Sequence, residues 1–388
     1  MKIMYVATQR PWPLTVGSRI RSYHVIKGLA RNHDVTIALV TDNPAEGEEP
    51  ESDQWPKCRL RMLNRKATTF SRSLLSRLWT RYRMVMHPAH KDVFRESLLK
   101  LIDKVQPDVT WYYQATPLWM AGCVNDIPRV YDMDDFESRK YSQLARHSQL
   151  WMRFVITLDT IPFARDEWAM LRRANVVLVS NPNDLSVLDG KAKSSVIVLP
   201  NGFDFKAPNI RYRQEKRILF FGCMTYGPCA DGIAWFCDSV WPKIIKMDAD
   251  TRLDIVGSYP DELARLSKVQ GVTMHGFVEN LEPFIQKSAF LVVPLRIAGG
   301  TRIKILEAWA KGLPVVSTSI GCEGLGAKDG VHLLIGDTPE MLAERCVELL
   351  RSPELGQKLA QESFDYGKQT FDWEQLYPIL ERALSLAN

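Results

Sequence analysis

The sequence predicts an α/β protein made of two domains, each built around a doubly wound parallel sheet. Three observations support this fold class. The chain has 388 residues, which exceeds the usual length of one domain. Short apolar runs alternate with segments of helical spacing along the chain. A segment rich in Pro, Gly, Asn and Asp, Pro200–Asn209, separates two series of such elements and predicts a linker.

The first series opens with a strand–helix–strand unit. Lys2–Ala7 is an apolar run that predicts a strand buried on both faces. In Arg19–Ala30 the apolar residues recur at helical spacing, and His33–Val40 predicts the next strand. The other strands of this domain are expected at Val109–Tyr113, Arg129–Asp132, Val176–Ser180 and Ser195–Leu199.

The second series begins with an expected strand at Arg217–Phe221 and a helix at Asp231–Ile245. We expect domains at residues 1–203 and 204–371 that face each other across a cleft, and a terminal helix at 372–388 that packs back on the first domain. Ligands of such sheets bind beyond the C-terminal ends of the strands. Further strands are expected at Arg252–Val256, Gly271–His275, Ala289–Val293 and Pro314–Val316, with helices at Glu282–Lys287 and Lys304–Lys311.

Charge and cysteine content narrow the class of protein. The formal net charge is +5, and residues 1–200 carry 29 basic and 21 acidic side chains, so the first half suits an acidic partner, a membrane face or a phosphate-bearing substrate. The seven cysteines form no C-x-x-C pair, which indicates reduced thiols. With neither a signal peptide nor a membrane span in the pattern, we expect a cytoplasmic protein.

The strongest functional signal lies between two expected strands. Gly299 and Gly300 let a phosphate approach the backbone, and the helix N-terminus beyond them offers free N–H groups and a positive dipole end. Thr301, Lys304 and Glu307 share one helical face. On this face a lysine can meet a diphosphate, and a carboxylate one turn further can accept hydrogen bonds from a ribose diol. The alternative is an ordinary helix cap with a solvated Lys–Glu pair.

This stretch resembles the donor site of the GT-B glycosyltransferases of family 4, the group 1 glycosyltransferases. Four other segments match that family in order. They resemble its interdomain motif, the strand and glycine that open the donor domain, the loop near the nucleotide base, and the start of the terminal helix. These segments are Leu199–Asp204, Leu219–Gly222, Gly276–Val278 and Phe371–Trp373. More narrowly, Tyr131–Ser138 and Gly299–Lys304 resemble the exosortase-associated sugar transferases of exopolysaccharide clusters.

The resemblance implies two Rossmann-like domains and a metal-independent transfer with retention of anomeric configuration. It implies a nucleoside-diphosphate sugar as donor and no cofactor. It adds donor contacts from Gly222, Gly276 and Phe277, beside Arg302 and the residues of the glycine stretch. We expect a glycan or a lipid-linked molecule as acceptor, in exopolysaccharide or cell-envelope glycan synthesis. The alternatives are a non-catalytic subunit that binds sugar or nucleotide, and a nucleotide-sugar 2-epimerase.

The sequence departs from the family at its phosphate cations. Many members carry Glu at the position of Gly299, Arg at that of Cys223 and Lys at that of Pro228. The leaving group develops negative charge in the transition state and needs a basic side chain. We therefore expect Lys304, with Arg302 beside it, to supply the charge for the diphosphate.

Three aspartates lie at the C-terminal end of an expected strand of the first domain. Family members often have a His before an Asp in this region, and here those positions are Asp134 and Asp135. With Lys304, these two are our candidate catalytic residues, and with Asp132 they would recognise sugar hydroxyls and orient the acceptor. The alternatives are a solvated acidic turn that caps the next helix, or a metal-bound sugar diphosphate. Because the resemblance is to metal-independent enzymes, we expect no metal.

The loop after the first strand resembles the family's N-terminal glycine-rich loop. Gly17 and Ser18 would approach the donor phosphate or the acceptor, and Arg19 would add charge. The alternative is an ordinary strand-to-helix turn. The sequence has no G-x-G-x-x-G motif, so a dinucleotide cofactor is not expected.

A basic segment, Lys57–Arg83, holds nine basic residues and no acidic one. Leu74, Leu78 and Tyr82 form an apolar stripe beside Arg77 and Arg81. Arg72–Arg83 therefore predicts an amphipathic helix that binds an anionic membrane surface, at the inner face of the membrane. The alternative is a helix packed on its own domain. Nucleic acid is not an expected partner, because no recognised binding module accompanies the charge.

Overall fold

The computed structural model divides the chain into two compact units. Unit 1 comprises Met1–Pro200 with Leu376–Asn388, and unit 2 comprises Asn201–Gln375. The expected boundary, between residues 203 and 204, lies three residues away. The structure describes residues 1–14, 16–41, 56, 58–64, 88–121, 126–134, 136, 138, 164–165, 167–188, 194–206, 215–297 and 302–388.

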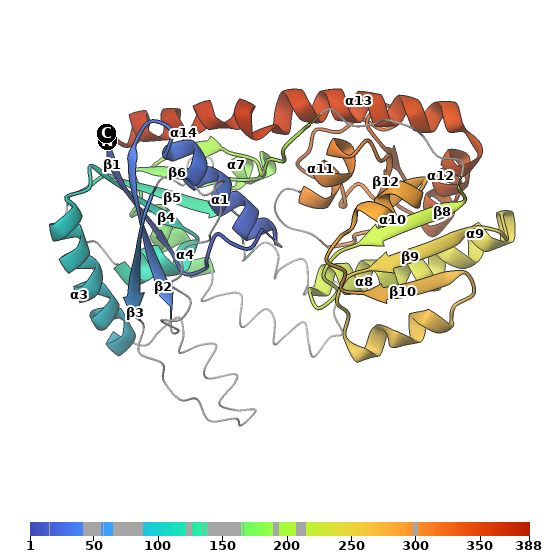
Figure 1. Ribbon diagram of the computed structural model, residues 1–388, viewed down its shortest axis with the longest axis horizontal. Coiled ribbons are helices and arrows are strands. Elements are labelled where there is room, and N and C mark those ends of the chain that lie inside the picture. The colour runs from blue at the N-terminus through green and yellow to red at the C-terminus, as the bar shows by residue number, and fades with distance from the viewer. Residues whose placement is uncertain are drawn as a thin grey trace. The chain divides into compact units, whose positions relative to one another are not determined.

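Unit 1 is built on a seven-stranded sheet in which neighbouring strands all pair in parallel (Figure 1). The strand order is β3-β2-β1-β4-β5-β6-β7. Four of these strands are uninterrupted buried runs, as expected for a sheet covered on both faces. The bounds are β1 Lys2–Ala7, β2 Asp34–Thr41, β3 Arg59–Asn64, β4 Val109–Tyr113, β5 Arg129–Asp134, β6 Val176–Val179 and β7 Ser195–Val198.

Helices cover both faces of this sheet. Helices α3, Pro88–Val105, and α4, Ala115–Ala121, share a hydrophobic core with alternate strand residues such as Met4 and Tyr112. Helix α1, Gly17–Leu29, lies on the opposite side from α3 (Figure 1). A short helix, α7, spans Asn183–Leu188 before β7.

The strand β3 is a finding that the sequence analysis missed. It lies at the start of the basic segment, where Arg59 and Arg61 interrupt the apolar residues. Leu60 and Leu63 are nevertheless buried, because an edge strand buries some side chains while its arginines reach solvent. The expected amphipathic helix at Arg72–Arg83 lies outside the described residues.

Unit 2 has a six-stranded parallel sheet in the order β10-β9-β8-β11-β12-β13. Two hydrophobic clusters fill its faces, one with α8, α9 and α12 and one with α11 and α13. The strands are β8 Arg217–Phe221, β9 Arg252–Val256, β10 Val272–Gly276, β11 Phe290–Val293, β12 Val315–Ser317 and β13 Leu334–Ile335. The helices are α8 Gly227–Trp235, α9 Trp241–Met247, α10 Glu282–Lys287, α11 Ile303–Ala310, α12 Pro339–Arg351 and α13 Pro353–Phe371, with a 3₁₀-helix at Asp261–Lys268.

The helix expected at Asp231–Ile245 is interrupted. It begins earlier, at Gly227, because Pro228 suits the first turn of a helix. A π-helical turn, Phe236–Val240, then joins α8 to α9. Pro242 lies in the first turn of α9 and has no N–H to donate, and the wider turn before it accommodates this loss.

The terminal helix α14, Trp373–Ala387, belongs to unit 1 from Leu376 onward. Its Tyr377 hydroxyl lies 3.3 Å from Nδ1 of His24 on α1, and its Glu381 pairs with His33 at 2.9 Å. Gly28 of α1 allows this close approach. A Cβ atom at Gly28 would lie only 2.4 Å from a ring carbon of Tyr377 and 2.7 Å from a methyl of Leu380.

We therefore predict that Gly28→Ala lowers the free energy of unfolding by about 1–3 kcal/mol, because the added methyl group overpacks the contact between α1 and α14. Urea denaturation of the full chain measures this change. Gly227→Ala is the matched control, since a Cβ atom there meets nothing within 4 Å. A Gly28→Ala protein as stable as the wild type would contradict the tight contact.

Candidate active site

The strand orders place a topological switch point in each unit. The order reverses between β1 and β4 in unit 1, and between β8 and β11 in unit 2. Ligands of open parallel sheets bind outside the C-terminal strand ends at such points. The loops that follow β1, β4 and β5, and those that follow β8 and β11, therefore hold the candidate residues of each unit.

In unit 2, Lys304 reaches across to the loop after β8. Its Nζ lies 3.3 Å from Sγ of Cys229 and 5.0 Å from the centroid of the Phe220 ring. A Cβ atom at Gly222 would lie 2.8 Å from the same Nζ. The ammonium group thus lies between the end of β8 and the first turn of α8, the segment in which Cys223 and Pro228 stand where the resembled family has cations.

Two glycines bring the ends of β8 and β9 together. Gly222 and Gly257 have φ angles of 151° and 132°, which side-chain-bearing residues rarely adopt. A Cβ atom at Gly257 would lie 2.0 Å from the carbonyl oxygen of Gly222. On the neighbouring strand Gly276 also has a positive φ, of 68°, and the Phe277 side chain after it is 68% exposed. The C-terminal ends of β8, β9 and β10 therefore present backbone without side chains, and an exposed aromatic ring follows β10.

Glu307 lies one turn beyond Lys304 on α11 and is half-buried. Burial raises the pKa of its carboxyl above the ordinary value; Lys311 and Lys304 lower it and Glu282 raises it further. Lys311 itself is paired with Glu282 at 2.7 Å. Among the described residues no side chain or backbone group donates a hydrogen bond to the Glu307 carboxylate, so its oxygens are available to accept hydroxyl groups.

Arg302 is turned toward a different partner. Its side chain is 4% exposed, and its guanidinium donates to the carbonyl oxygen of Ile320 at 3.0 Å and lies 3.5 Å from the Glu323 carboxylate. These contacts fix the loop after β12 against the start of α11. They do not favour a donor contact for Arg302. Gly299, Gly300 and Thr301 lie outside the described residues.

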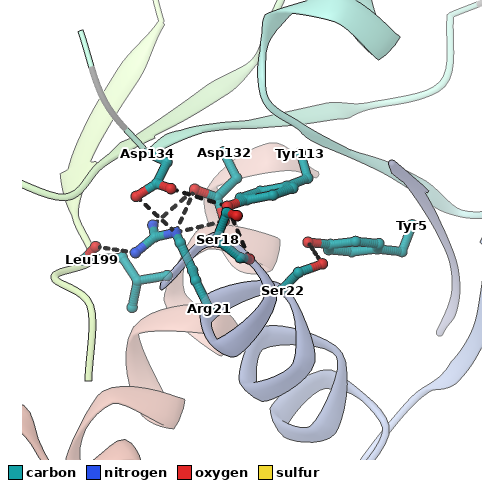
Figure 2. A network of polar contacts seen from close by, with 8 residues as sticks. All are labelled: Tyr5, Ser18, Arg21, Ser22, Tyr113, Asp132, Asp134 and Leu199. Carbon is teal, nitrogen blue, oxygen red and sulfur yellow. Dashed lines mark hydrogen bonds and ion pairs between the residues drawn. The ribbon is translucent and has the colours of Figure 1, made fainter. Parts of the chain in front are cut away.

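In unit 1 two aspartates of β5, Asp132 and Asp134, meet a buried arginine of α1 (Figure 2). The Arg21 side chain is fully buried, as is Asp132. Nε and Nη2 of Arg21 donate to Oδ1 of Asp132 at 3.0 and 2.8 Å, and Nη1 donates to the carbonyl oxygen of Leu199 at 2.9 Å. Burial lowers the pKa of Arg21, but the carboxylates of Asp132 and Asp134 outweigh it and raise that pKa, so the guanidinium stays charged.

Asp134 occupies the end of β5 next to this ion pair. Its Oδ2 accepts a 3.0 Å hydrogen bond from the Tyr113 hydroxyl, and its Oδ1 lies 3.8 Å from Nε of Arg21. Burial, with the nearby Asp134 charge, raises the pKa of Tyr113, which therefore remains a neutral donor. Asp134 has a left-handed φ of 61°, and the pairing of β5 with β6 shifts register between Asp132 and Asp134.

This geometry changes the interpretation of the aspartates. The solvated acidic turn is wrong, because Asp132 is 0% and Asp134 9% exposed. Full burial in an ion pair also argues against direct contact between Asp132 and a sugar. Asp134, at the strand end, keeps its candidate role, and Asp135 lies outside the described residues.

The glycine-rich loop ends where α1 begins. Gly17 is the first residue of α1, and no side chain caps that helix N-terminus. The Ser18 hydroxyl donates to Gln9 at 2.9 Å, and its carbonyl oxygen lies 3.1 Å from the Tyr113 hydroxyl. Arg19 is half-buried, and its Nε has no hydrogen-bond partner among the described residues. The loop is therefore tied to the same tyrosine as Asp134.

Sequence reasoning missed Arg21 and Tyr113. Tyr113 ends a predicted strand and Arg21 lies within a predicted helix, so each was assigned to an element without a role. A charged residue among the buried positions of an amphipathic helix was the available signal, since a buried arginine needs an anionic partner. The local sequence does not indicate which residue is the anionic partner, because Asp132 lies 111 residues away.

Within the described ranges, no group of three or more His, Cys, Asp or Glu side chains is arranged to hold a metal ion. No helix in this part of the chain is long and apolar enough to cross a membrane.

Comparison with known proteins finds a family model that matches part of the second unit. Residues 215–352 match the family model of the glycosyl transferases group 1. An uncharacterised 44.6 kDa protein from the cps region of Klebsiella pneumoniae is 23% identical over 169 residues. That match covers 41% of this chain and 44% of the relative, less than half of either.

Solved structures resemble the chain over nearly its whole length. Sucrose-phosphate synthase from Thermosynechococcus elongatus superposes with a TM-score of 0.76 at 16% identity, covering 100% of both chains. HepE from Anabaena, in complex with UDP and glucose, gives a TM-score of 0.68 at 13% identity and 99% coverage of both. WaaG, a glycosyltransferase of lipopolysaccharide biosynthesis, gives 0.67 at 14% identity, covering 98% of this chain and 99% of its own.

At these identities the structural likeness establishes the fold, which is that of the GT-B glycosyltransferases. The match of residues 215–352 places the second unit in one family of that fold. This match confirms the resemblance to the group 1 glycosyltransferases that the motifs of the sequence show.

The raised pKa of Glu307 gives a prediction for stability. The folded-state pKa lies above the unfolded value, so burial of this carboxyl costs stability once the pH exceeds the folded pKa and costs nothing below the unfolded pKa. We expect Glu307→Gln to raise the free energy of unfolding by up to about 1 kcal/mol at neutral pH, and by less as the pH falls toward about 4.

Urea denaturation at the two pH values measures the effect. Glu344→Gln, at an exposed position of α12, is the control and should change little at either pH. A Glu307→Gln protein that is less stable than the wild type at neutral pH would show that the carboxylate is stabilised by its surroundings, against this account.

Proposed function

We propose that this glycosyltransferase moves a sugar from a nucleoside-diphosphate sugar to a glycan or a lipid-linked acceptor, with retention of anomeric configuration. The observation that carries the proposal is the ammonium group of Lys304, which lies against Gly222 at the switch point of unit 2. A cation at this point suits the diphosphate of the donor. Retention is inferred from the resemblance to family 4 enzymes.

Unit 2 offers a contact for each part of the donor. Lys304 and the N-terminus of α11, a helix of eight residues, oppose the negative charge that develops on the leaving diphosphate. Gly222 and Gly257 let the phosphates approach the backbone. The Glu307 carboxylate accepts the ribose hydroxyls, and Gly276 with the exposed Phe277 lies beside the base.

Unit 1 supplies the acceptor contacts in this proposal. Asp134 accepts a hydrogen bond from the attacking sugar hydroxyl and orients it, while Gly17, Ser18 and Arg19 form the neighbouring loop and helix N-terminus. Orientation of the nucleophile lowers the entropic part of the barrier. The cps-region relative supports a place in exopolysaccharide or cell-envelope glycan synthesis. HepE, solved with UDP and glucose, supports a uridine-diphosphate sugar as the first donor to test.

We predict that Lys304→Ala weakens UDP binding by about 10- to 100-fold, because one charge-assisted contact to the diphosphate is lost. Isothermal titration calorimetry with UDP measures the change. Lys243→Ala is the control, since it removes an exposed ion pair with Glu340 on α9 and α12. Equal UDP affinity in the wild type and the Lys304→Ala protein would contradict the assignment.

A second variant tests whether Lys304 replaces the family's loop cation. Cys223 is exposed and stands at the position of the usual arginine. In a Lys304→Ala background, Cys223→Arg should recover a large part of the lost UDP affinity, because it returns a cation to the same loop. No recovery, with the protein folded, would place the function of Lys304 elsewhere.

Turnover decides between transfer and the other activities. The wild-type protein, incubated with UDP-glucose and a panel of glycans, should form a product whose new linkage has the configuration of the donor, as seen by proton NMR. An epimerised nucleotide sugar formed without acceptor would support the 2-epimerase. Binding of UDP-glucose without any turnover would support a non-catalytic subunit.

We also propose that the basic segment binds an anionic membrane surface. The proposal rests on the sequence of residues 72–83, which lie outside the described residues. Co-sedimentation with vesicles that contain phosphatidylglycerol should fall with rising salt and with Arg77→Glu/Arg81→Glu, because the attraction is electrostatic. Sedimentation that survives both changes would contradict the proposal.

A further inference from the structure

The buried ion pair of unit 1 has no part in donor binding, yet it joins three segments that are distant in sequence. Arg21 lies on α1, Asp132 on β5, and Leu199 just after β7 (Figure 2). Burying two charges carries a large desolvation cost, and apolar side chains of similar size are often equally stabilising. Packing alone therefore gives little reason for an arginine at this position.

The guanidinium does have a geometric consequence for Asp134. It approaches one oxygen of the Asp134 carboxylate at 3.8 Å, while the Tyr113 hydroxyl donates to the other at 3.0 Å. The left-handed φ of 61° at Asp134 is uncommon for a residue other than glycine and persists where surrounding contacts hold it. Arg21 and Tyr113 are two of these contacts, one on each side of the carboxylate (Figure 2).

We propose that Arg21 is a positioning residue for Asp134. Arg21 is fully buried and acts through Asp134 without touching the acceptor. Its guanidinium anchors on Asp132 and on the Leu199 carbonyl, and from this anchor it holds the Asp134 carboxylate at the end of β5. Leu199 is followed by Pro200, the last residue of unit 1 before the chain enters unit 2. One side chain thus sets both the acceptor-orienting carboxylate and the chain that leaves the unit. The inference rests on the role proposed above for Asp134.

The planar fork of an arginine is necessary for this arrangement. Arg21 donates from Nε and Nη2 to one carboxylate while Nη1 reaches a carbonyl in another direction. A lysine has the same charge but a single ammonium group, which cannot make these contacts in one fixed plane. Arg21→Lys therefore separates the effect of charge from that of geometry.

The experiment compares transfer with donor binding in two variants. Arg21→Met/Asp132→Leu removes the pair without leaving one charge buried alone, and Arg21→Lys keeps the charge. We expect both proteins to bind UDP within about twofold of the wild type, since the donor contacts lie in unit 2. We expect kcat for transfer from UDP-glucose to the glycan acceptor to fall by about 10- to 100-fold, as for a misplaced orienting group. Hydrolysis of UDP-glucose by water should change little.

Tyr5→Phe is the matched control. Tyr5 makes a buried 2.8 Å hydrogen bond to Ser22 of α1 and stacks on Tyr113 (Figure 2), and among the described residues it makes no hydrogen bond to Asp132 or Asp134. It should transfer at the wild-type rate. If the double variant does not fold, Arg21→Lys carries the test alone; an unchanged kcat in that variant would overturn the proposal.

The outcomes separate this inference from the proposed function. A wild-type protein that transfers sugar, with unchanged kcat in Arg21→Met/Asp132→Leu, overturns the positioning role alone. A variant whose transfer and hydrolysis fall together, with lowered UDP affinity, shows a general structural role and also overturns it. A wild-type protein that transfers no sugar to any acceptor counts against the proposed function, and with it against this inference.

Discussion

The contact between Lys304 and the backbone at Gly222 is the constraint on which the site of unit 2 depends. It requires a parallel sheet that places β11, and the helix after it, beside β8. Glycine is also favoured at 222, because side-chain-bearing residues rarely adopt its φ angle of 151°. The fold thus places the Lys304 ammonium of α11 beside the loop after β8, which lacks the basic residues that are usual there. The position of Glu307 follows from the helical period, because it lies one turn beyond Lys304.

Unit 1 has the same parallel-sheet architecture, but its candidate site is built around a buried ion pair. Next to its switch point, the buried Arg21 pairs with Asp132 and lies near Asp134. These charged groups are buried at the ends of the strands. Asp132 accepts most of the hydrogen bonds that the Arg21 guanidinium donates. Of the two carboxylates, Asp134 is therefore the more exposed. A buried ion pair is weak evidence for stability, but it can fix a single arrangement of polar groups, which is the property that an orienting site needs.

Much of the fold could be predicted from the sequence. The apolar runs at Lys2–Ala7, Val109–Tyr113 and Arg217–Phe221 have the bounds of β1, β4 and β8, because strands covered on both faces have little choice of residue. Edge strand β3 was missed since its arginines break the apolar pattern. The π-helical turn before α9 was missed because periodicity does not report a single extra residue in a turn.

The candidate site could be predicted only where its residues are close in sequence. Lys304 and Glu307 lie on one short helix, so their spacing could be seen in the sequence. Arg21 meets its carboxylate across 111 residues, and no local pattern could pair them. Arg302 shows the converse: adjacent to Lys304 in sequence, it is buried against Ile320 and Glu323 because the next loop folds over the start of α11.

The central claim is that unit 2 holds a nucleotide chiefly through its diphosphate. Calorimetric titration of the wild-type protein with UDP, GDP and ADP, each beside its nucleoside, tests it most directly. The account predicts that the best diphosphate binds at least about 100-fold more tightly than its nucleoside, a difference of about 2.7 kcal/mol. Equal affinity for nucleoside and diphosphate would contradict it.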